Sequence, residues 1–291
     1  MTGQNNHQLN YRLTYQLNYA DDRQKPYIDE LIALIVKRQL PINFVISKLD
    51  KKPSQKQQVI LAADNTPNLW LDKHNKLTWL SAQGEVTPSW DKLQKRIVTA
   101  GRKSELLLQA AKITSSSKVL DATAGFGHDA LILASSGANV TLLEKLPMMA
   151  LLLTAEQFRM SHEKNWQKLM ARLQIYAMDL QAFYQSQNKA QADFDVVYLD
   201  PMFPEDSYLD AKSGRGAQVN KRMQALHHIA PPPTLSEESE LLANAKALLI
   251  NPNKTCRVIV KRPKQAPFLA KTTPDDSWQN DAVRFDAYFV C

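Results

Sequence analysis

The sequence predicts an α/β protein, in which a Rossmann-like sheet with helices on both faces follows a small N-terminal α+β unit. Of the 291 residues, 44% are hydrophobic and 22% are charged, which are ordinary proportions for a globular chain. From residue 118 onward, short apolar runs of strand length alternate with longer runs of helical periodicity, as in βαβ units. The first of these strands leads into a turn that contains Gly125 and Gly127, and turns of this kind often bind ligands.

The N-terminal unit is expected to span residues 1–90. Its first 25 residues are rich in Gln, Asn and Tyr without a sustained period, so they form either a loose arm or an extra strand. Residues 26–40 place apolar side chains at helical spacing behind a proline, which predicts a short helix. Small strands are expected in the three apolar runs that follow: residues 59–64, 68–72 and 76–81.

The second domain is expected to span residues 91–291. Helices are predicted over residues 91–113, 128–136, 147–171 and 237–250. Strands are predicted over residues 118–121, 139–144, 173–177, 194–200, 257–261 and 284–290. This alternation predicts a parallel, doubly wound sheet, and such sheets bind ligands at the carboxyl ends of their strands.

The glycine motif lies between a predicted strand that ends at Asp121 and a predicted helix that begins at His128. Gly125 and Gly127 allow the backbone to approach a ligand, and the helix start offers free N–H groups. One alternative is a tight turn that binds nothing. Another is a dinucleotide site, although Ala130 occupies the position of its third glycine. The acidic strand end at Asp121 instead suits a ligand that carries a cationic amine.

Acidic residues also follow the next two strands. Glu144 comes about 20 residues after the glycines, the spacing at which an acidic side chain holds ribose hydroxyls. Asp179 follows the third strand and is a candidate acceptor for an adenine amine. Its alternative role is the N-cap of a helix that begins at Leu180.

A fourth motif runs from a buried strand into Asp200-Pro201-Met202-Phe203-Pro204. The prolines stiffen the loop and hold the carboxylate and the aromatic ring together. An exocyclic base amine is a poor nucleophile, because its lone pair is delocalised into the ring. A carboxylate or carbonyl that accepts its N–H bonds would localise that lone pair, and an aromatic ring could stack on the base. The alternative is an ordinary loop with a buried Phe203.

Charge and cysteine usage restrict the partners and the compartment. With 36 Lys and Arg against 29 Asp and Glu, the net charge is +7, which fits a polyanionic partner. Basic side chains precede the glycine motif and follow the fourth and fifth strands: Lys92, Lys95, Arg96, Arg102, Lys103, Lys212, Arg215, Lys221, Arg222, Lys261, Arg262 and Lys264. Two distant cysteines form neither a disulfide framework nor a zinc cluster, and no apolar leader or membrane span is present. A cytoplasmic protein without metal or membrane partners is therefore expected.

The four motifs together resemble those of S-adenosylmethionine-dependent methyltransferases. The last one resembles the (D/N)PP(Y/F) signature of enzymes that methylate exocyclic amines, with Met202 in place of the second proline. The ordered strings DATAGFGHDA, LLEK, VVYLDPMFP, VIVKRP and RFDAY resemble the bacterial small-subunit ribosomal RNA (guanine-N2) methyltransferase J family. The resemblance covers residues 98–291, extends weakly through 59–97 and leaves residues 1–50 unplaced.

This resemblance implies a methyltransferase domain that uses S-adenosylmethionine and acts on guanine N2 in small-subunit (16S) ribosomal RNA, as free RNA or in an assembling subunit. It implies that Asp200 and Phe203 are catalytic. The implied cofactor-binding residues are Asp121, Gly125, Gly127, His128, Asp129, Glu144, Lys145, Met178, Asp179 and Asp200. His128 departs from the family, which often has Arg there, and Met178-Asp179 stands where relatives often carry small polar residues.

Two other functions remain open at the level of sequence. The nearer one is methylation of adenine N6 in DNA or RNA, because the motifs do not define the base. The farther one is a non-catalytic RNA-binding protein on the same fold, which would bind RNA with a steep salt dependence but would not bind the cofactor. The set formed by Asp121, Gly125, Gly127, Glu144 and Asp200 argues against the second alternative.

Overall fold

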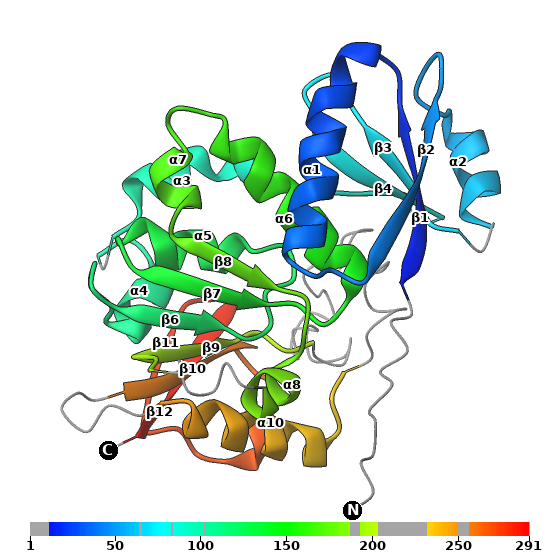
Figure 1. The fold of residues 1–291 in the computed structure, drawn as a ribbon. Helices are drawn as coiled ribbons and strands as arrows, with labels where there is room; N and C mark the ends of the chain where they lie inside the picture. Colours follow the sequence, from blue (N-terminus) through cyan, green and yellow to red (C-terminus); the bar gives the residue numbers. More distant parts are fainter. Residues whose placement is uncertain are drawn as a thin grey trace, which may run out of the picture. The chain divides into compact units, whose positions relative to one another are not determined.

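The chain forms two compact units, Met1–Val86 and Thr87–Cys291, in the computed structural model shown in Figure 1. The structure describes residues 12–63, 66–82, 84–101, 103–186, 193–202, 232–249 and 256–290. Among the sites named from the sequence, Phe203 lies outside these ranges, and so do Arg102 and the basic residues Lys212, Arg215, Lys221 and Arg222. Each unit is built around its own sheet.

The first unit contains a five-stranded sheet in the order β2-β1-β3-β4-β5. Its strands are β1 (Leu13–Tyr19), β2 (Ile42–Lys48), β3 (Asn68–Leu71), β4 (Leu77–Ser81) and β5 (Gly84–Val86). Strand β1 pairs in parallel with β2 and β3, whereas β3, β4 and β5 pair in antiparallel fashion. The predicted helix over residues 26–40 is confirmed as α1 (Lys25–Lys37), which buries Ile28, Leu31 and Ile35. The first 25 residues were expected to form either a loose arm or an extra strand; Leu13–Tyr19 form the strand β1, and residues 1–11 lie outside the described ranges.

The predicted strand over residues 59–64 is wrong, because Gln55–Ala62 form the helix α2. A capping box starts this helix: the Gln57 side chain accepts a hydrogen bond from the Ser54 N–H at 2.9 Å. The following residues are mostly Gln, Lys, Leu and Ala, which favour a helix. The apolar run that suggested a strand is therefore the last part of a capped helix.

The second unit contains a seven-stranded sheet in the order β11-β12-β10-β9-β6-β7-β8. Its strands are β6 (Lys118–Asp121), β7 (Asn139–Leu143), β8 (Leu173–Tyr176), β9 (Val196–Leu199), β10 (Cys256–Pro263), β11 (Asp276–Gln279) and β12 (Val283–Val290). The five adjacent strands β10, β9, β6, β7 and β8 are parallel, as predicted. The prediction of an entirely parallel sheet is wrong at one edge, where β12 pairs antiparallel with both β10 and β11, because the short connection over residues 280–282 turns the chain back after β11.

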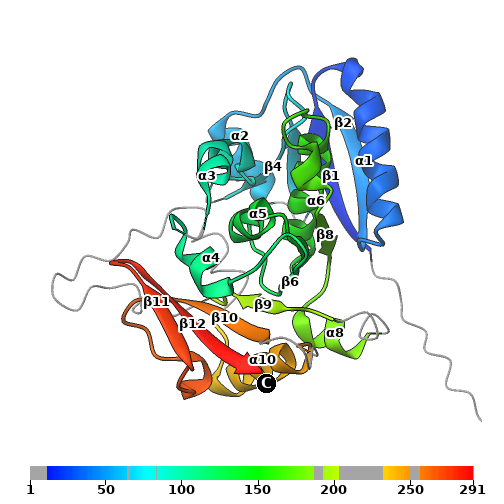
Figure 2. The same cartoon turned by 90° about the vertical axis from the view of Figure 1, so that its left-hand side faces the viewer.

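Helices cover both faces of this sheet (Figures 1 and 2). One face carries α3 (Gln94–Thr99), α4 (Leu106–Ala111), α5 (His128–Ser135), α6 (Pro147–Ser161) and α7 (Gln167–Met170), which enclose a core with β6 and β7. The other face carries α8 (Leu180–Gln185) and α10 (Leu235–Ala247) over a second core. Parallel strands buried on both faces require apolar runs, and Val196–Leu199 is such a run.

Two long helices predicted from the sequence are each divided in the structure. Residues 91–113 form the 3-10 turn Trp90–Leu93 followed by α3 and α4, and extended backbone at Ala100 separates the two helices. Residues 147–171 form α6 and α7. Trp90, the last residue of the span expected for the N-terminal unit, lies in the second unit, where it is fully buried. No helix in the described ranges is long and apolar enough to cross a membrane.

The order of strands fixes where a ligand can bind. The chain runs from β6 to β7 and β8 on one side of the sheet, then returns to β9 and β10 on the other side. The connections that leave β6 and β9 therefore diverge, and a crevice opens at the carboxyl ends of these two adjacent strands. Asp121 ends β6 and Asp200 follows β9, so two of the predicted residues lie at this crevice.

Candidate active site

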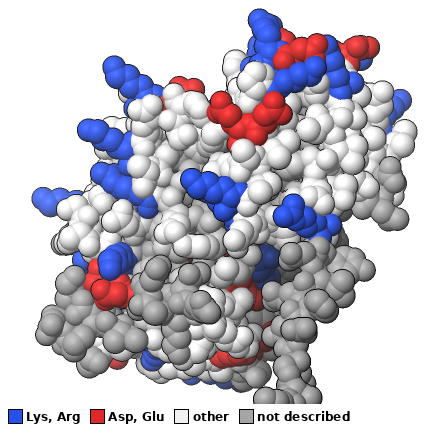
Figure 3. Space-filling model, in the orientation of Figure 1, with Lys and Arg blue, Asp and Glu red and all other residues white. Residues whose placement is uncertain are grey.

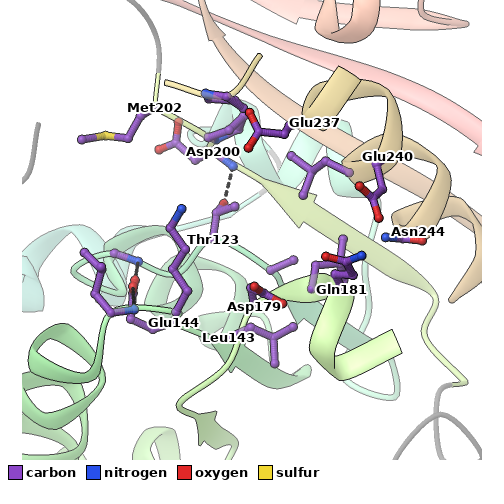
Figure 4. A pocket seen from close by; sticks show the side chains of 18 of the residues that line it. Thr123, Leu143, Glu144, Asp179, Gln181, Asp200, Met202, Glu237, Glu240 and Asn244 are labelled. Carbon is purple, nitrogen blue, oxygen red and sulfur yellow. Dashed lines mark hydrogen bonds between the residues drawn. The ribbon is translucent and has the colours of Figure 1, made fainter. Parts of the chain in front are cut away.

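A cavity of about 360 Å³ opens at the crevice, within the size range of small-molecule sites. The loops that follow β6, β7, β8 and β9 form one side, and α10 forms another (Figure 4). Five predicted residues line it: Gly125, Glu144, Lys145, Asp179 and Asp200. The structure thus brings together one residue or more from each of the four motifs.

The two glycines of the first motif have different surroundings. Gly125 lines the cavity with a φ of +52°, and the nearest atom to a Cβ placed there would be the Thr123 carbonyl oxygen, 4.0 Å away. Gly127 has a φ of +70° and does not line the cavity; a Cβ there would lie 3.0 Å from Leu153 and from Trp90. Gly125 therefore leaves room for a ligand, whereas Gly127 allows close packing at the start of α5.

Trp90 and Glu144 hold the glycine loop in place. The Trp90 indole N–H donates to the Phe126 carbonyl at 2.7 Å. The Glu144 carboxylate accepts one hydrogen bond from the Gly125 N–H at 3.0 Å and another from the Leu146 N–H at 2.8 Å. Burial raises the pKa of Glu144 to about 7, although these backbone hydrogen bonds act in the opposite direction. Glu144 therefore joins the loops after β6 and β7 and also faces the cavity.

Asp121 and Asp179 each accept a hydrogen bond from a backbone N–H a few residues further along the chain. Asp121 is 1% exposed, does not line the cavity and accepts a hydrogen bond from the Thr123 N–H at 3.2 Å. Burial raises its pKa well above the ordinary value. Asp179 accepts a hydrogen bond from the Ala182 N–H at 2.7 Å, which makes it the N-cap of α8, and it also lines the cavity. The two roles considered for Asp179 are thus compatible.

Asp200 belongs to a charged network that is centred on Lys261. Its N–H donates to Thr123 Oγ1 at 2.6 Å, which joins the loops after β9 and β6 (Figure 4). Its carboxylate accepts a hydrogen bond from the Lys261 ammonium at 2.9 Å, and the same ammonium lies 2.8 Å from the Asp129 carboxylate. Burial raises the pKa of Asp200, and Lys261 opposes that rise. The site thus presents a partly buried carboxylate with a fixed cationic partner.

The remaining predicted residues are close to the cavity but do not line it. His128 stacks on Phe126 with ring centroids 5.8 Å apart. Met178 packs against the core under α8 and α10. Asp129 belongs to the network around Lys261. The motif positions suggested that these three side chains would line the cavity. In the structure they contact other parts of the protein instead.

Sequence reasoning missed three groups in this site. Lys261 and Arg262 were grouped with RNA-contacting cations, yet Lys261 bridges two carboxylates and Arg262 is 3% exposed and paired with Glu238. Tyr198 donates to Asp129 at 2.6 Å. The α10 side of the cavity was also unassigned, and it presents Glu237, Glu240 and Asn244 (Figure 4). The string VIVKRP was the available signal for Lys261, because it places a lysine at the end of a buried strand.

The residues of the cavity fit S-adenosylmethionine. The space beside Gly125 admits a ligand against the backbone, and Glu144 offers a carboxylate to ribose hydroxyls. Asp179 and Asp200 add carboxylates near which a cationic ligand is favoured, while Leu143, Leu180 and Met202 add apolar surface. Within the described ranges, no group of three His, Cys, Asp or Glu residues could hold a metal ion.

The chain matches the family described as putative SAM-dependent methyltransferase over residues 46–290. A protein of Psychrobacter cryohalolentis named ribosomal RNA small subunit methyltransferase J is 54% identical over 96% of each chain. A protein of the same name from Acinetobacter baylyi is 39% identical over 72% of this chain and 77% of its own.

A solved structure described as a SAM-dependent methyltransferase from Neisseria gonorrhoeae superposes with a TM-score of 0.64 at 24% identity. The match covers 94% of this chain and 95% of that one. At that identity the likeness concerns the fold, and it confirms the predicted Rossmann-like α/β class.

Proposed function

The chain belongs to the ribosomal RNA small subunit methyltransferase J family of S-adenosylmethionine-dependent methyltransferases, and from this premise we propose its substrate and reaction. It transfers a methyl group from S-adenosylmethionine to the exocyclic N2 of a guanine in small-subunit ribosomal RNA. The observation that carries the proposal is the position of Asp200, whose carboxylate lines the same cavity as Gly125 and Glu144. A cytoplasmic location follows from this substrate.

The cofactor half of the proposed site lies along the loops after β6 and β7. Gly125 gives the cofactor access to the backbone, Glu144 accepts hydrogen bonds from its ribose, and Asp179 accepts one from its adenine. When bound, S-adenosylmethionine supplies a methyl group already activated by the sulfonium. Lys145 lines the same part of the cavity. Asp121, Gly127, His128 and Met178 support this half through the loops and the core rather than by direct contact.

The amine half of the proposed site is centred on Asp200. Its carboxylate accepts an N–H of the target amine, which orients the nitrogen lone pair toward the methyl group. The nitrogen loses one proton as its bond to the methyl carbon forms, and an oxygen of the Asp200 carboxylate is the acceptor. Most of the rate then comes from positioning. Phe203 remains a prediction as the stacking partner of the base, since it lies outside the described residues.

A methylation assay tests this proposal. The substrates are an unmodified small-subunit RNA transcript, small subunits reconstituted from that transcript, and a DNA duplex rich in adenine. Nucleosides released after the reaction are identified by mass spectrometry. We expect N2-methylguanosine from the RNA transcript or the subunits, and the comparison of these two shows whether the substrate is free or assembled RNA. N6-methyladenosine, or no product from any substrate, would contradict the proposal.

Two variants identify the residue that carries the reaction. Asp200→Asn keeps an oxygen that accepts an N–H bond of the amine but cannot take up its proton, so the loss of proton uptake should lower the rate by about 100-fold or more. Asp193→Asn is the matched control, since Asp193 is exposed and its ion pair with Lys118 lies at the amino end of β6. It removes the same charge and should keep the wild-type rate. Equal rates for Asp200→Asn and Asp193→Asn would remove Asp200 from the mechanism.

A further inference from the structure

Lys261 is placed between two carboxylates at the crevice. Its ammonium lies 2.8 Å from Asp129 Oδ2 and 2.9 Å from Asp200 Oδ2. The three side chains come from β10, α5 and the end of β9, so packing of the sheet and its helices fixes their separation. All three are partly buried, with side-chain exposures of 26% for Lys261, 16% for Asp129 and 35% for Asp200. Solvent therefore screens this network only in part.

Other charged and titratable groups face the network from the surrounding elements. Asp129 also accepts a hydrogen bond from the Tyr198 hydroxyl at 2.6 Å. Arg96 from α3 lowers the pKa of Asp129, whereas the charges of Asp129, Asp200 and Glu144 help to raise the pKa of Asp121 at the neighbouring strand end. Arg96 is itself paired with Glu105 at 2.7 Å. Lys261 is the cation that contacts the network's two carboxylates directly, and it is shared between them.

The two carboxylates respond to this cation in different ways. Burial favours the neutral form of both, but Lys261 and Tyr198 lower the pKa of Asp129 below its ordinary value. Burial keeps the pKa of Asp200 raised and the nearby negative Asp129 adds to that rise, although the contact with Lys261 opposes it. The pKa of Lys261 is raised by the two carboxylates in spite of its burial, so it remains charged. Asp200 is thus the member of the network that is closest to taking up a proton.

We propose that Lys261 is a positioning residue for methyl transfer: it holds Asp200 by Oδ2 and keeps that carboxylate ionised until the target amine gives up its proton. Within the described part of the chain, Oδ1 of Asp200 accepts no hydrogen bond, which leaves it available to the amine. This inference rests on the proposed function. It adds to that function a reason for the ionic state of Asp200 and a role for Asp129.

The proposed step is balanced within the network. The lone pair of the amine nitrogen forms the new N–C bond, and the electron pair of the broken C–S bond stays on the sulfur. One N–H proton moves to Asp200, which becomes a neutral carboxyl group. Lys261 then still has Asp129 as an ionic partner, so no buried cation is left unpaired. The proton leaves Asp200 to water once the product departs.

Two substitutions should shift the pH dependence of the rate in opposite directions. Lys261→Met removes the cation that opposes the rise in the Asp200 pKa, so the fall in kcat on the acid side should move to higher pH. We expect kcat to drop at least about tenfold at pH 6 and to recover in part as the pH is raised. Asp129→Asn removes the carboxylate that shares Lys261 with Asp200, so the fall in the kcat of this variant on the acid side should move to lower pH. Lys261→Arg keeps the charge and should restore most of the rate that Lys261→Met loses.

A purely structural role for Lys261 predicts a different result. It would lower the rate of Lys261→Met by the same factor at every pH, and it would give no opposite shift in Asp129→Asn. Either outcome would overturn the inference. Lys118→Gln is the control for removal of a lysine, because Lys118 is exposed and lies at the amino end of β6. Thermal unfolding of each variant confirms that it is folded at the assay temperature.

A readout that does not depend on activity follows the carboxyl group itself. Protein labelled with ¹³C at the aspartate Cγ is titrated by NMR, and the Asp200 signal is assigned by its absence in Asp200→Asn. The midpoint for Asp200 should be highest in Lys261→Met, intermediate in the wild type and lowest in Asp129→Asn. If the wild type is active and the Asp200 midpoint is the same in the wild type and in Lys261→Met, the proposed role of Lys261 is overturned, while the proposed function stands. A wild type that methylates no guanine in small-subunit RNA would instead overturn the proposed function.

Discussion

Glu144 is subject to two opposing effects at one carboxylate. Burial favours its neutral form, and hydrogen bonds from the Gly125 and Leu146 N–H groups favour its charged form. Burial prevails, and the pKa of about 7 lies above the ordinary value of 4.5. Between these two pH values the folded protein binds more protons at this group than the unfolded chain does. Its contribution to stability therefore falls as the pH rises through this window.

This pKa predicts how cofactor binding depends on pH. Ribose hydroxyls donate more strongly to a carboxylate than to a neutral carboxyl group, so the affinity for S-adenosylmethionine should rise from pH 6 to pH 8. Calorimetric titration at pH 6, 7 and 8 measures this change. Glu144→Gln should bind more weakly at pH 8 and should lose the part of the pH dependence that Glu144 causes. An unchanged pH dependence in Glu144→Gln would assign the effect to another group.

Gly125 and Gly127 should respond differently to the same substitution. Both have positive φ, so alanine costs about 1 kcal/mol of backbone energy at either position. At Gly127 the new Cβ would also lie 3.0 Å from Leu153 and Trp90, and the total loss of stability should be about 2–3 kcal/mol. At Gly125 the Cβ meets no close neighbour but faces the cavity.

Urea denaturation and calorimetric titration separate the two glycine effects. Gly127→Ala should lose more stability, whereas Gly125→Ala should lose more affinity for S-adenosylmethionine. If both variants lost affinity equally and were equally stable, Gly127 would have to contact the cofactor directly.

At the scale of elements, the sequence predicted the core of the second unit well. Strands β6, β7, β8 and β9 and the helix α5 are short, strongly patterned segments whose hydrophobic runs belong to a sheet buried on both faces. Four motifs at the ends of these strands converge on one cavity, because the carboxyl ends of parallel strands share one edge. Local pattern and topology agree here, so the position of this cavity could be predicted from the sequence.

The elements that were missed depend on information that a hydrophobic pattern does not contain. Helix α2 was misassigned because its capping box at Ser54 and Gln57 was overlooked. Strand β11, Asp276–Gln279, is polar and mostly exposed, so its pairing with β12 gives it no apolar signature. The sequence does not distinguish Lys261 from a surface cation, because it does not show which carboxylates from other elements surround a lysine in the fold.

A buried ion pair between Glu238 of α10 and Arg262 of β10 joins the helix to the sheet. Glu238 accepts a hydrogen bond from Arg262 at 3.0 Å and another from the Ala270 N–H at 2.8 Å. The Arg262 side chain is 3% exposed and that of Glu238 is 15% exposed, so their attraction is little screened. Because α10 carries Glu237, Glu240 and Asn244 into the cavity, this contact also positions one side of the site.

Loss of the Glu238 charge should therefore destabilise the second unit. Glu238→Gln removes the carboxylate charge that lies 3.0 Å from the buried Arg262, and we expect the free energy of unfolding to fall by about 2 kcal/mol. Asp193→Asn removes the same charge from an exposed ion pair and should change stability by less than about 0.5 kcal/mol. Urea denaturation measures both values. A loss below about 1 kcal/mol for Glu238→Gln would show that α10 is held by its apolar contacts alone.

At the scale of the whole molecule, the net charge of +7 means that basic side chains outnumber acidic ones. Where the exposed basic side chains lie therefore decides which surface can bind a polyanion. Figure 3 shows basic side chains along the left edge of the second unit, over α3 and α7. Lys95 on α3 and Lys168 on α7 are exposed, and so are Lys92 and Lys164, which lie just before these helices in the sequence. Arg96, on the same helix as Lys95, is near enough to Asp129 to lower the pKa of that carboxylate. The basic surface of α3 therefore reaches toward the end of the sheet that holds the candidate active site.

This arrangement predicts that Lys92 and Lys95 contact RNA phosphates. Each phosphate contact contributes about 0.7–0.9 to the slope of log K against log salt concentration. The double variant Lys92→Gln/Lys95→Gln should bind small-subunit RNA more weakly at low salt and with a slope shallower by up to about 1.8. Its affinity for S-adenosylmethionine should be that of the wild type. Fluorescence anisotropy with labelled RNA at several salt concentrations measures the slope.

The control for this prediction must change the charge equally at another place. Lys118 and Lys271 are exposed lysines of the second unit, and Lys118 lies at the amino end of β6, opposite the cavity. Lys118→Gln/Lys271→Gln lowers the net charge by the same two units. If net charge alone attracts RNA, both double variants lose the same slope; if α3 is the contact surface, the slope changes in the first variant and stays at the wild-type value in the second. Because phosphate contacts carry no base information, the choice of guanine then depends on the cavity beside Asp200.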